Sequence, residues 1–302
     1  MVARGESVDR AWQAVAMNSA AGHGDVRAGG GPAPAVGSFA AAVRVRPLGD
    51  GTFTADLPAA WTVGGRPHGG FLMALLAKAA VATHTGSGTP LVDPLSVSAQ
   101  FLRPPGVGPV LLRTDVRKSG RRTTVVSVHL EQSGHSCVEG LVTTGRLPRE
   151  RAAWTDLPNQ SAEPPGNAID LSAMRSASAF KLSETCDVRL DPNGAGFLHG
   201  HIGDPLRLRL WARPRGEHPD PLFALVAGDI SMPVTFNLGR VGWSPTVQLT
   251  AFLRSRPAPG WLRIQVESKA VHGMWFDADA TVVDSTGRLV CQARQLALSA
   301  IG

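Results

Sequence analysis

Residues 64–80 have the sequence GGRPHGGFLMALLAKAA, in which a glycine-rich turn leads directly into an apolar segment. From Phe71 onward the segment is apolar on nearly every side, with Lys78 as its one charged residue. A helix of this composition must be enclosed by other elements, because no face of it suits water. The sequence therefore predicts a buried helix over residues 69–82, which His68-Gly69-Gly70 opens.

Segments of alternating apolar and polar residues lie around this helix and are separated by glycine and proline turns, as in strands with one buried face. A sheet that wraps the apolar helix is the simplest way to bury both, which makes the predicted fold class α+β. The predicted strands of this region are 41–57, 95–102, 110–117, 123–132 and 137–146.

The same pattern recurs later in the chain. A shift of 150 residues places the apolar residues Val126, Val128 and Leu130 on the apolar residues Phe276, Ala278 and Ala280, with polar residues between them in both copies. A repeat of this length predicts two copies of one structural unit. In the second copy the helix is predicted at 221–232 and the strands at 186–190, 206–212, 245–254, 261–269, 274–283 and 288–298.

The repeat also sets the predicted domain organisation. Two units are expected at 38–147 and 183–302, and the segment 148–182, which has little periodicity and several Pro and Ser residues, is the linker between them. The first 37 residues are rich in Ala, Gly, Ser and Pro and are predicted to form a disordered extension, 1–37.

Composition excludes several classes of protein. The chain of 302 residues is 43% hydrophobic and 18% charged, which is typical of globular proteins. No apolar run reaches the roughly 18–20 residues that span a membrane. The net charge of +6 comes from scattered arginines with no nucleic-acid-binding motif. Three widely spaced cysteines argue against a disulfide framework and favour a cytoplasmic protein.

The glycine turn at the start of an apolar helix, the strands that follow and the duplication together resemble the hotdog superfamily. More narrowly, the chain resembles the type II acyl-CoA thioesterase family, in which two hotdog units share one chain. The resemblance covers about residues 38–147 and 183–300. It implies a double hotdog fold, hydrolysis of an acyl-CoA substrate without a metal or other cofactor, and possible assembly of such chains into a homo-oligomer.

Thioester hydrolysis requires a positioned water, a group that takes its proton, and donors for the carbonyl oxygen as it becomes an oxyanion. The first turn of the helix at 69–82 can supply such donors, because the first amides of a helix are unpaired and lie at its positive end. The amides of Gly70 and Phe71 are the expected donors. The predicted oxyanion- or substrate-binding residues are His68, Gly69, Gly70 and Phe71, although His68 could serve only as a helix cap or packing residue.

The second copy differs from the first at the corresponding positions. The 150-residue shift places His218-Pro219-Asp220 opposite the glycine turn, Asp229 opposite Ala79 and Gln295 opposite Gly145. A carboxylate within an apolar helix needs a partner or a chemical role, because an unpaired buried charge is costly. Asp229 could instead face solvent at the helix end, and Gln295 could simply bond to backbone at the end of the sheet.

In the thioesterases that this chain resembles, an Asp, a Thr or Ser and a Gln of the second hotdog bind the nucleophilic water. By position these would be Asp229, Thr246 and Gln295. Because Thr246, Gln248 and Thr250 alternate along one predicted strand, they are expected on one face, and Gln248 or Thr250 could take the place of Thr246. One active site per chain is expected, between the units, with the turn from one copy and the acid from the other.

Two other functions remain open at this point. One is a catalytically silent module that binds acyl-CoA, since a duplicated fold can keep a pocket and lose its chemistry. The other is an enoyl-thioester hydratase or dehydratase, a chemistry that in hotdog families uses an Asp with a His a few residues later, or a His with an acid across the dimer. No histidine occurs in the forty residues that follow Asp229.

Overall fold

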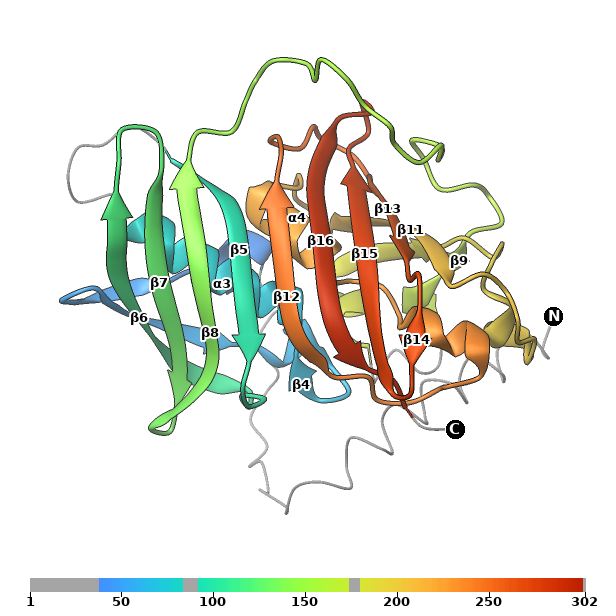
Figure 1. The fold of residues 1–302 in the computed structure, drawn as a ribbon, viewed down its shortest axis with the longest axis horizontal. Helices are drawn as coiled ribbons and strands as arrows, with labels where there is room; N and C mark the ends of the chain where they lie inside the picture. Colours follow the sequence, from blue (N-terminus) through green and yellow to red (C-terminus); the bar gives the residue numbers. More distant parts are fainter. Residues whose placement is uncertain (1–37, 84–91, 174–179, 301–302) are drawn as a thin grey trace.

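A computed structural model describes residues 38–83, 92–173 and 180–300. Its main feature is one antiparallel sheet of 14 strands that runs through both copies (Figure 1). The order across the sheet is β1-β2-β6-β7-β8-β5-β12-β16-β15-β13-β11-β10-β9, and β14 pairs with β15. The first copy contributes β1 (Arg46–Gly49), β2 (Thr52–Leu57), β5 (Asp93–Phe101), β6 (Gly108–Ser119), β7 (Thr124–Gln132) and β8 (His135–Gly145). The second contributes β10 (Cys186–Leu190), β11 (Arg207–Pro214), β12 (Thr246–Leu253), β13 (Leu262–Glu267), β14 (Val271–His272), β15 (Trp275–Val283) and β16 (Leu289–Leu298), and β9 (Ile169–Asp170) comes from the segment between the copies.

The two copies join where β5 pairs with β12. In this antiparallel pair Ser98 lies opposite Thr250, and their hydroxyl oxygens are 2.8 Å apart. The two residues are 152 positions apart and each belongs to the same strand of its copy, so this pair lies at the approximate twofold axis that relates the copies. The pairing fuses the sheets of both units into one.

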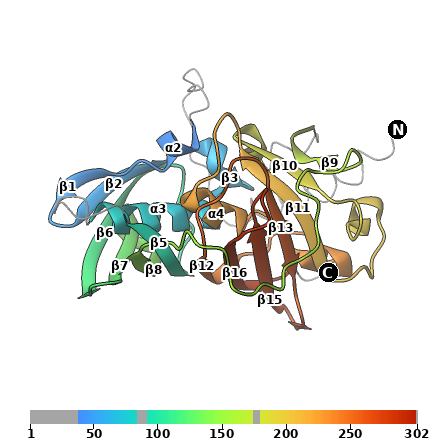
Figure 2. The same ribbon diagram turned by 90° about the horizontal axis from the view of Figure 1, so that it is seen from above.

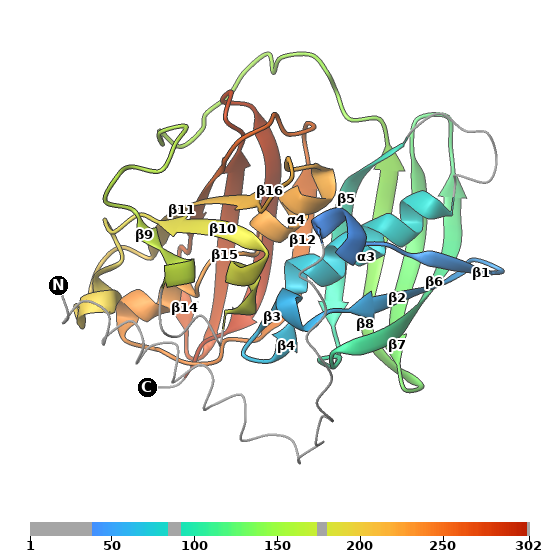
Figure 3. The same ribbon diagram turned by 180° about the vertical axis from the view of Figure 1, so that it is seen from behind.

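Helices α3 (Gly69–Ala82) and α4 (Pro221–Ala227) lie next to each other on the inner side of the curved sheet (Figures 2 and 3). All seven residues of α4 are buried, and α3 is buried along nearly its whole length. Each helix is covered by the strands of its own copy and by the other helix. The predicted enclosed helix at 69–82 and the predicted double hotdog of class α+β are confirmed.

Short elements complete each unit. A two-stranded hairpin, β3 (Thr62–Val63) and β4 (Arg66–Pro67), leads into α3. Its turn is Gly64-Gly65, with φ of 56° and 76°, and two successive residues at positive φ favour glycine. The hairpin therefore fixes where α3 begins. The remaining short elements are α2 (Phe39–Ala42) and the 3₁₀ turns η1 (Ala59–Trp61), η3 (Leu171–Ala173), η5 (Lys181–Glu184), η6 (Gly196–His199) and η7 (Val234–Leu238).

Two predicted elements differ from the structure. The predicted strand 41–57 is α2 followed by a hairpin of β1 and β2, because Asp50 and Gly51 turn the chain with φ of 48° and 69°. The predicted helix 221–232 ends at Ala227. Gly228 and Asp229 are weak helix formers and Pro233 cannot continue a helix, so Asp229 lies just beyond α4 and not within it.

The repeat has a different register from the predicted shift of 150 residues. His68 and Asp220 both cap a helix, and their side chains accept hydrogen bonds from the amides of Phe71 and Phe223. The glycine turn therefore corresponds to Asp220-Pro221-Leu222, a shift of 152 residues, and not to His218-Pro219-Asp220.

The same correction applies to the two polar candidates of the second copy. Val97 and Leu249 correspond across the axis, and their partners in the neighbouring strands are Val142 and Gln295. The counterpart of Gln295 is therefore Val142 and not Gly145. With the shift of 152, Asp229 corresponds to Ala77 and not to Ala79. The neighbouring strands agree, because Val126 pairs with Val142 and Ala278 pairs with Gln295, which is again a shift of 152. An error of two residues preserves the alternation of a strand, so the 150-residue shift still matched apolar with apolar residues.

In the segment predicted as a linker, 148–182, the described residues 148–173 follow the surface of the second unit and contribute β9 to the sheet edge (Figure 1). The amide of Gln160 donates to the carbonyl of Leu210 at 2.8 Å, and the indole of Trp211 donates to the carbonyl of Ser161 at 2.8 Å. The predicted extension, 1–37, lies outside the described residues. In the described part of the chain, no helix combines the length and apolar content needed to cross a membrane.

Candidate active site

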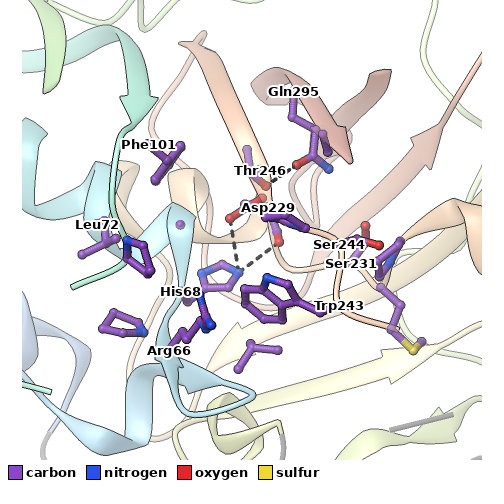
Figure 4. A pocket seen from close by; sticks show the side chains of 18 of the residues that line it. Arg66, His68, Leu72, Phe101, Asp229, Ser231, Trp243, Ser244, Thr246 and Gln295 are labelled. Atoms are coloured by element: carbon purple, nitrogen blue, oxygen red, sulfur yellow. Dashed lines mark hydrogen bonds and ion pairs between the residues drawn. The ribbon is translucent and has the colours of Figure 1, made fainter. Parts of the chain in front are cut away.

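A cavity of about 230 Å³ lies between the two units, at the start of α3 and the end of α4 (Figure 4). Both copies contribute to its walls. The first copy supplies Val63, Arg66, Pro67, His68, Gly69, Leu72, Phe101, Arg103, Pro104 and Pro105, and Phe180 follows from the segment between the copies. The second supplies Asp229, Ile230, Ser231, Met232, Pro233, Gly242, Trp243, Ser244, Pro245, Thr246, Phe276, Gln295 and Ala297.

Asp229 reaches from the end of α4 to the first turn of α3. Its Oδ2 accepts a hydrogen bond from the amide of Gly70 at 2.7 Å, and its side chain is only 9% exposed. The approach of the two helices depends on Gly70, because a Cβ there would lie 2.7 Å from the carbonyl oxygen of Leu225. The glycine turn of one copy thus holds the acid of the other, as the sequence predicted.

Burial raises the pKa of the Asp229 carboxyl above its usual value, and the nearby His68 and the amide of Gly70 oppose that rise. A carboxylate with a raised pKa is a stronger base than a solvated one. It can therefore take a proton from a bound water more readily near neutral pH.

His68 contacts both copies through its ring. Its Nδ1 accepts a hydrogen bond from the amide of Phe71 at 3.3 Å. Its Nε2 lies 3.0 Å from the carbonyl oxygen of Asp229 and 3.5 Å from the carboxylate Oδ2. Through these contacts His68 acts as a helix cap that also orients Asp229.

The amides predicted to bind the oxyanion are engaged in this structure. Gly70 donates to Asp229 and Phe71 donates to His68, while Phe71 itself is fully buried. Gly69 lines the cavity, and its amide has no hydrogen-bond acceptor among the described residues. Of the predicted group, Gly69 therefore presents the free donor at the positive end of α3.

Thr246 and Gln295 lie together on the cavity wall opposite α3 (Figure 4). The hydroxyl of Thr246 donates to Oε1 of Gln295 at 2.8 Å. This bond fixes the orientation of the amide and leaves its NH₂ group available as a donor. Thr246 retains lone pairs that can accept a hydrogen bond from a bound water.

The expectation that Thr246, Gln248 and Thr250 share one face is wrong. A β-bulge between Thr246 and Gln248 adds a residue to β12, so that Thr246 lies opposite the inward-facing Ala297 and Gln248 lies opposite the exposed Leu296. Thr250 bonds to Ser98 on the outer face. Of the three candidates, only Thr246 lines the cavity.

The cavity wall includes Trp243, which sequence reasoning had passed over. Trp243 lies in the irregular segment before β12, where no periodicity marks it, and the guanidinium of Arg66 lies 5.0 Å from the centroid of its ring. Arg66 and Arg103 also line the cavity. The contact of Arg66 with Trp243 joins the two units across the site.

The corresponding position on the other side of the approximate twofold axis lacks these groups. Leu222 replaces Gly70, Ala77 replaces Asp229 and Val142 replaces Gln295. Within the described residues, the contact between a carboxylate and a helix-start amide of the other copy therefore occurs once. This asymmetry favours one site per chain.

Two tandem hotdog units with a single carboxylate, hydroxyl and amide site between them define a double-hotdog thioester hydrolase. Comparison with known proteins agrees with that class: residues 57–145 match the N-terminal domain of acyl-CoA thioesterases and residues 155–299 match their C-terminal domain. The chain belongs to the acyl-CoA thioesterase family.

Similar proteins occur in several bacteria. The chain is 40% identical to uncharacterized proteins of Mycobacterium tuberculosis and Mycobacterium bovis, over 86% of this chain and 97% of theirs. Among solved structures, a protein of Thermobifida fusca assigned as thioesterase II is 28% identical with a TM-score of 0.77, over 87% of this chain and 97% of that one. The tesB protein of Mycobacterium avium subspecies paratuberculosis shares the fold, with 21% identity, a TM-score of 0.69 and coverage of 87% and 98%.

Burial of the Asp229 carboxyl predicts that replacing it with asparagine stabilises the fold at neutral pH. Because the pKa of Asp229 is raised on folding, its stabilising contribution is complete at acid pH, below the carboxyl pKa of the unfolded chain, and is lost as pH rises through the folded pKa. The side chain of asparagine does not ionise, so Asp229→Asn does not lose this stability as pH rises. We expect a variant that is more stable than the native protein at pH 7.5, with no gain near pH 4.

Thermal unfolding at both pH values measures this difference. A variant that is less stable than the native protein at pH 7.5 would show instead that the contacts of the ionised carboxylate with Gly70 and His68 outweigh its burial.

Proposed function

We propose that this protein hydrolyses acyl-CoA thioesters to the free acid and CoA, using a water held by Asp229, Thr246 and Gln295. The observation that carries the proposal is the Asp229 carboxylate, which is buried in the cavity between the units and has a raised pKa. Family membership supports thioester hydrolysis, and the cavity supplies each group that the reaction requires.

In the proposed reaction Asp229 takes a proton from the water as its oxygen attacks the thioester carbonyl carbon. The negative charge that develops on the carbonyl oxygen is stabilised at the start of α3, where the amide of Gly69 is free to donate. The C–S bond then breaks, CoA leaves as the thiolate, and Asp229 returns the proton to its sulfur. The NH₂ group of Gln295 and the hydroxyl of Thr246 hold the water in line with the carbonyl carbon.

The test is a panel of short, medium and long acyl-CoAs with a reagent that detects free thiol. We expect the native protein to release thiol from at least one length. Release from none of them would contradict hydrolysis and would leave a silent module that binds acyl-CoA.

One observation favours a second candidate, an enoyl-thioester hydratase or dehydratase. His68 lies 3.5 Å from the carboxylate of Asp229 although the two residues come from different copies, which is the pairing of a His with an acid across two units. Against this candidate, Nδ1 of His68 is engaged in capping α3. Crotonyl-CoA separates the two reactions, because hydration removes the absorbance of the conjugated double bond without releasing thiol.

A substitution in β16 tests the role of the amide. Gln295→Ala is expected to lower kcat/KM for the best acyl-CoA by at least about 10²-fold, because the water loses the group that orients it. The matched control is Gln292→Ala, since Gln292 lies on the same strand but is exposed on the outer face. Equal rates for the two variants would remove Gln295 from the site.

A further inference from the structure

The cavity has both exposed and buried lining residues. Arg103 and Pro104 are exposed, whereas Ile230, Met232 and Phe276 are at most 3% exposed. The buried apolar lining suits an acyl chain, and the exposed arginine suits the phosphates of CoA.

Ser244 is one of the polar residues that line the cavity. It lines the cavity together with Ser231, on the side away from Leu72 and Phe101 (Figure 4). Its hydroxyl oxygen is sealed from solvent and has no hydrogen-bond partner among the described residues. A buried hydroxyl without a partner is unfavourable, and native structures rarely keep one without a reason.

A ligand oxygen is a suitable partner for this hydroxyl. A serine hydroxyl both donates and accepts, and rotation about χ1 between staggered positions can direct it into the cavity. Ser244 is two residues before Thr246, so their Cα atoms are at most about 7 Å apart. The partner oxygen would consequently lie close to the thioester, on one of the first few carbons of the acyl chain.

We infer that Ser244 is a specificity-determining residue for acyl groups that carry a hydroxyl or oxo substituent near the thioester. The inference rests on the proposed hydrolysis and concerns the acyl group that the same site accepts. The buried apolar lining holds the carbon chain, and Ser244 bonds to the oxygen of the substituent.

The experiment compares kcat/KM for a 3-hydroxyacyl-CoA and for the unsubstituted acyl-CoA of equal length, at the length that the native protein hydrolyses best. We expect the native protein to prefer the hydroxylated ester by about tenfold, the discrimination that one neutral hydrogen bond supplies. In Ser244→Ala the ratio should fall to about one, and in Ser244→Thr, which keeps the hydroxyl, the preference should return. Ser119→Ala is the control, because Ser119 is exposed at the far end of β6.

The ratio of kcat/KM for the hydroxylated and the unsubstituted ester tests the role of Ser244 separately from the proposed hydrolysis. If neither ester nor any other acyl-CoA releases thiol, the proposed hydrolysis itself fails. If both esters are hydrolysed equally by the native protein, or if Ser244→Ala keeps the preference or lowers both rates in proportion, hydrolysis stands and the role of Ser244 is overturned.

Discussion

Asp229→Asn is expected to lower kcat/KM for acyl-CoA hydrolysis by at least about 10²-fold, and by up to about 10⁴-fold if proton transfer limits the reaction. Asparagine is almost the same size and can still accept the hydrogen bond that the amide of Gly70 donates to Oδ2. The fold and the cavity should therefore persist while the base is lost. The measurement is steady-state release of thiol by the native protein and the variant.

The pH profile gives this prediction a second readout. The base acts only when it is ionised, so kcat/KM should fall as pH drops through the pKa of Asp229. Because burial raises that pKa, the fall should begin at a higher pH than for a solvent-exposed carboxyl. The residual activity of Asp229→Asn should lack this acid limb.

Asp156→Asn is the matched control, since Asp156 is exposed in the segment between the units. Its rates and pH profile should equal those of the native protein. If Asp229→Asn kept native turnover, the assignment of Asp229 as the base would be wrong, even with hydrolysis established.

Gly70→Ala is expected to destabilise the protein and to separate the site residues. A Cβ at Gly70 would lie 2.7 Å from the carbonyl oxygen of Leu225, 2.9 Å from the Cα of Val226 and 3.0 Å from the Cβ of Asp229. The first two contacts are with backbone, which cannot rotate away, so α3 and α4 must move apart. Overpacking of this kind typically costs about 1–3 kcal/mol, or a fall in Tm of about 2–12 °C for a chain of this size.

The sign of the change in stability tests whether the two helices need their close approach at Gly70. Glycine to alanine inside an exposed helix normally stabilises by about 0.5–1 kcal/mol, the opposite of what is expected at Gly70. Gly166→Ala is the control, because a Cβ there meets no atom within 4 Å and its φ is not positive. Its stability should stay within about 0.5 kcal/mol of the native protein. Native stability and activity in Gly70→Ala would show that the helices do not need the close approach.

Much of the architecture follows from local pattern. The apolar segment that begins at Phe71 fits only an enclosed helix, and the alternation from Val126 to Leu130, repeated from Phe276 to Ala280, fits only strands with one buried face. Asp229 and Gln295 stood out for the same reason, since each interrupts an apolar pattern. These features depend only on residues that are neighbours along the chain, so the amino-acid sequence alone is enough to predict them.

The arrangement of the candidate site depends on partners from distant parts of the chain. The bulge that turns Thr246 inward and leaves Gln248 outside arises from how β12 pairs with β16, whereas strict alternation along β12 alone places both residues on one face. The amide of Gly70 bonds to Asp229 only because α3 and α4 meet between the copies. Strand register and helix contact are set by packing between segments some 150 residues apart in the chain, and the pattern along any one segment does not contain them.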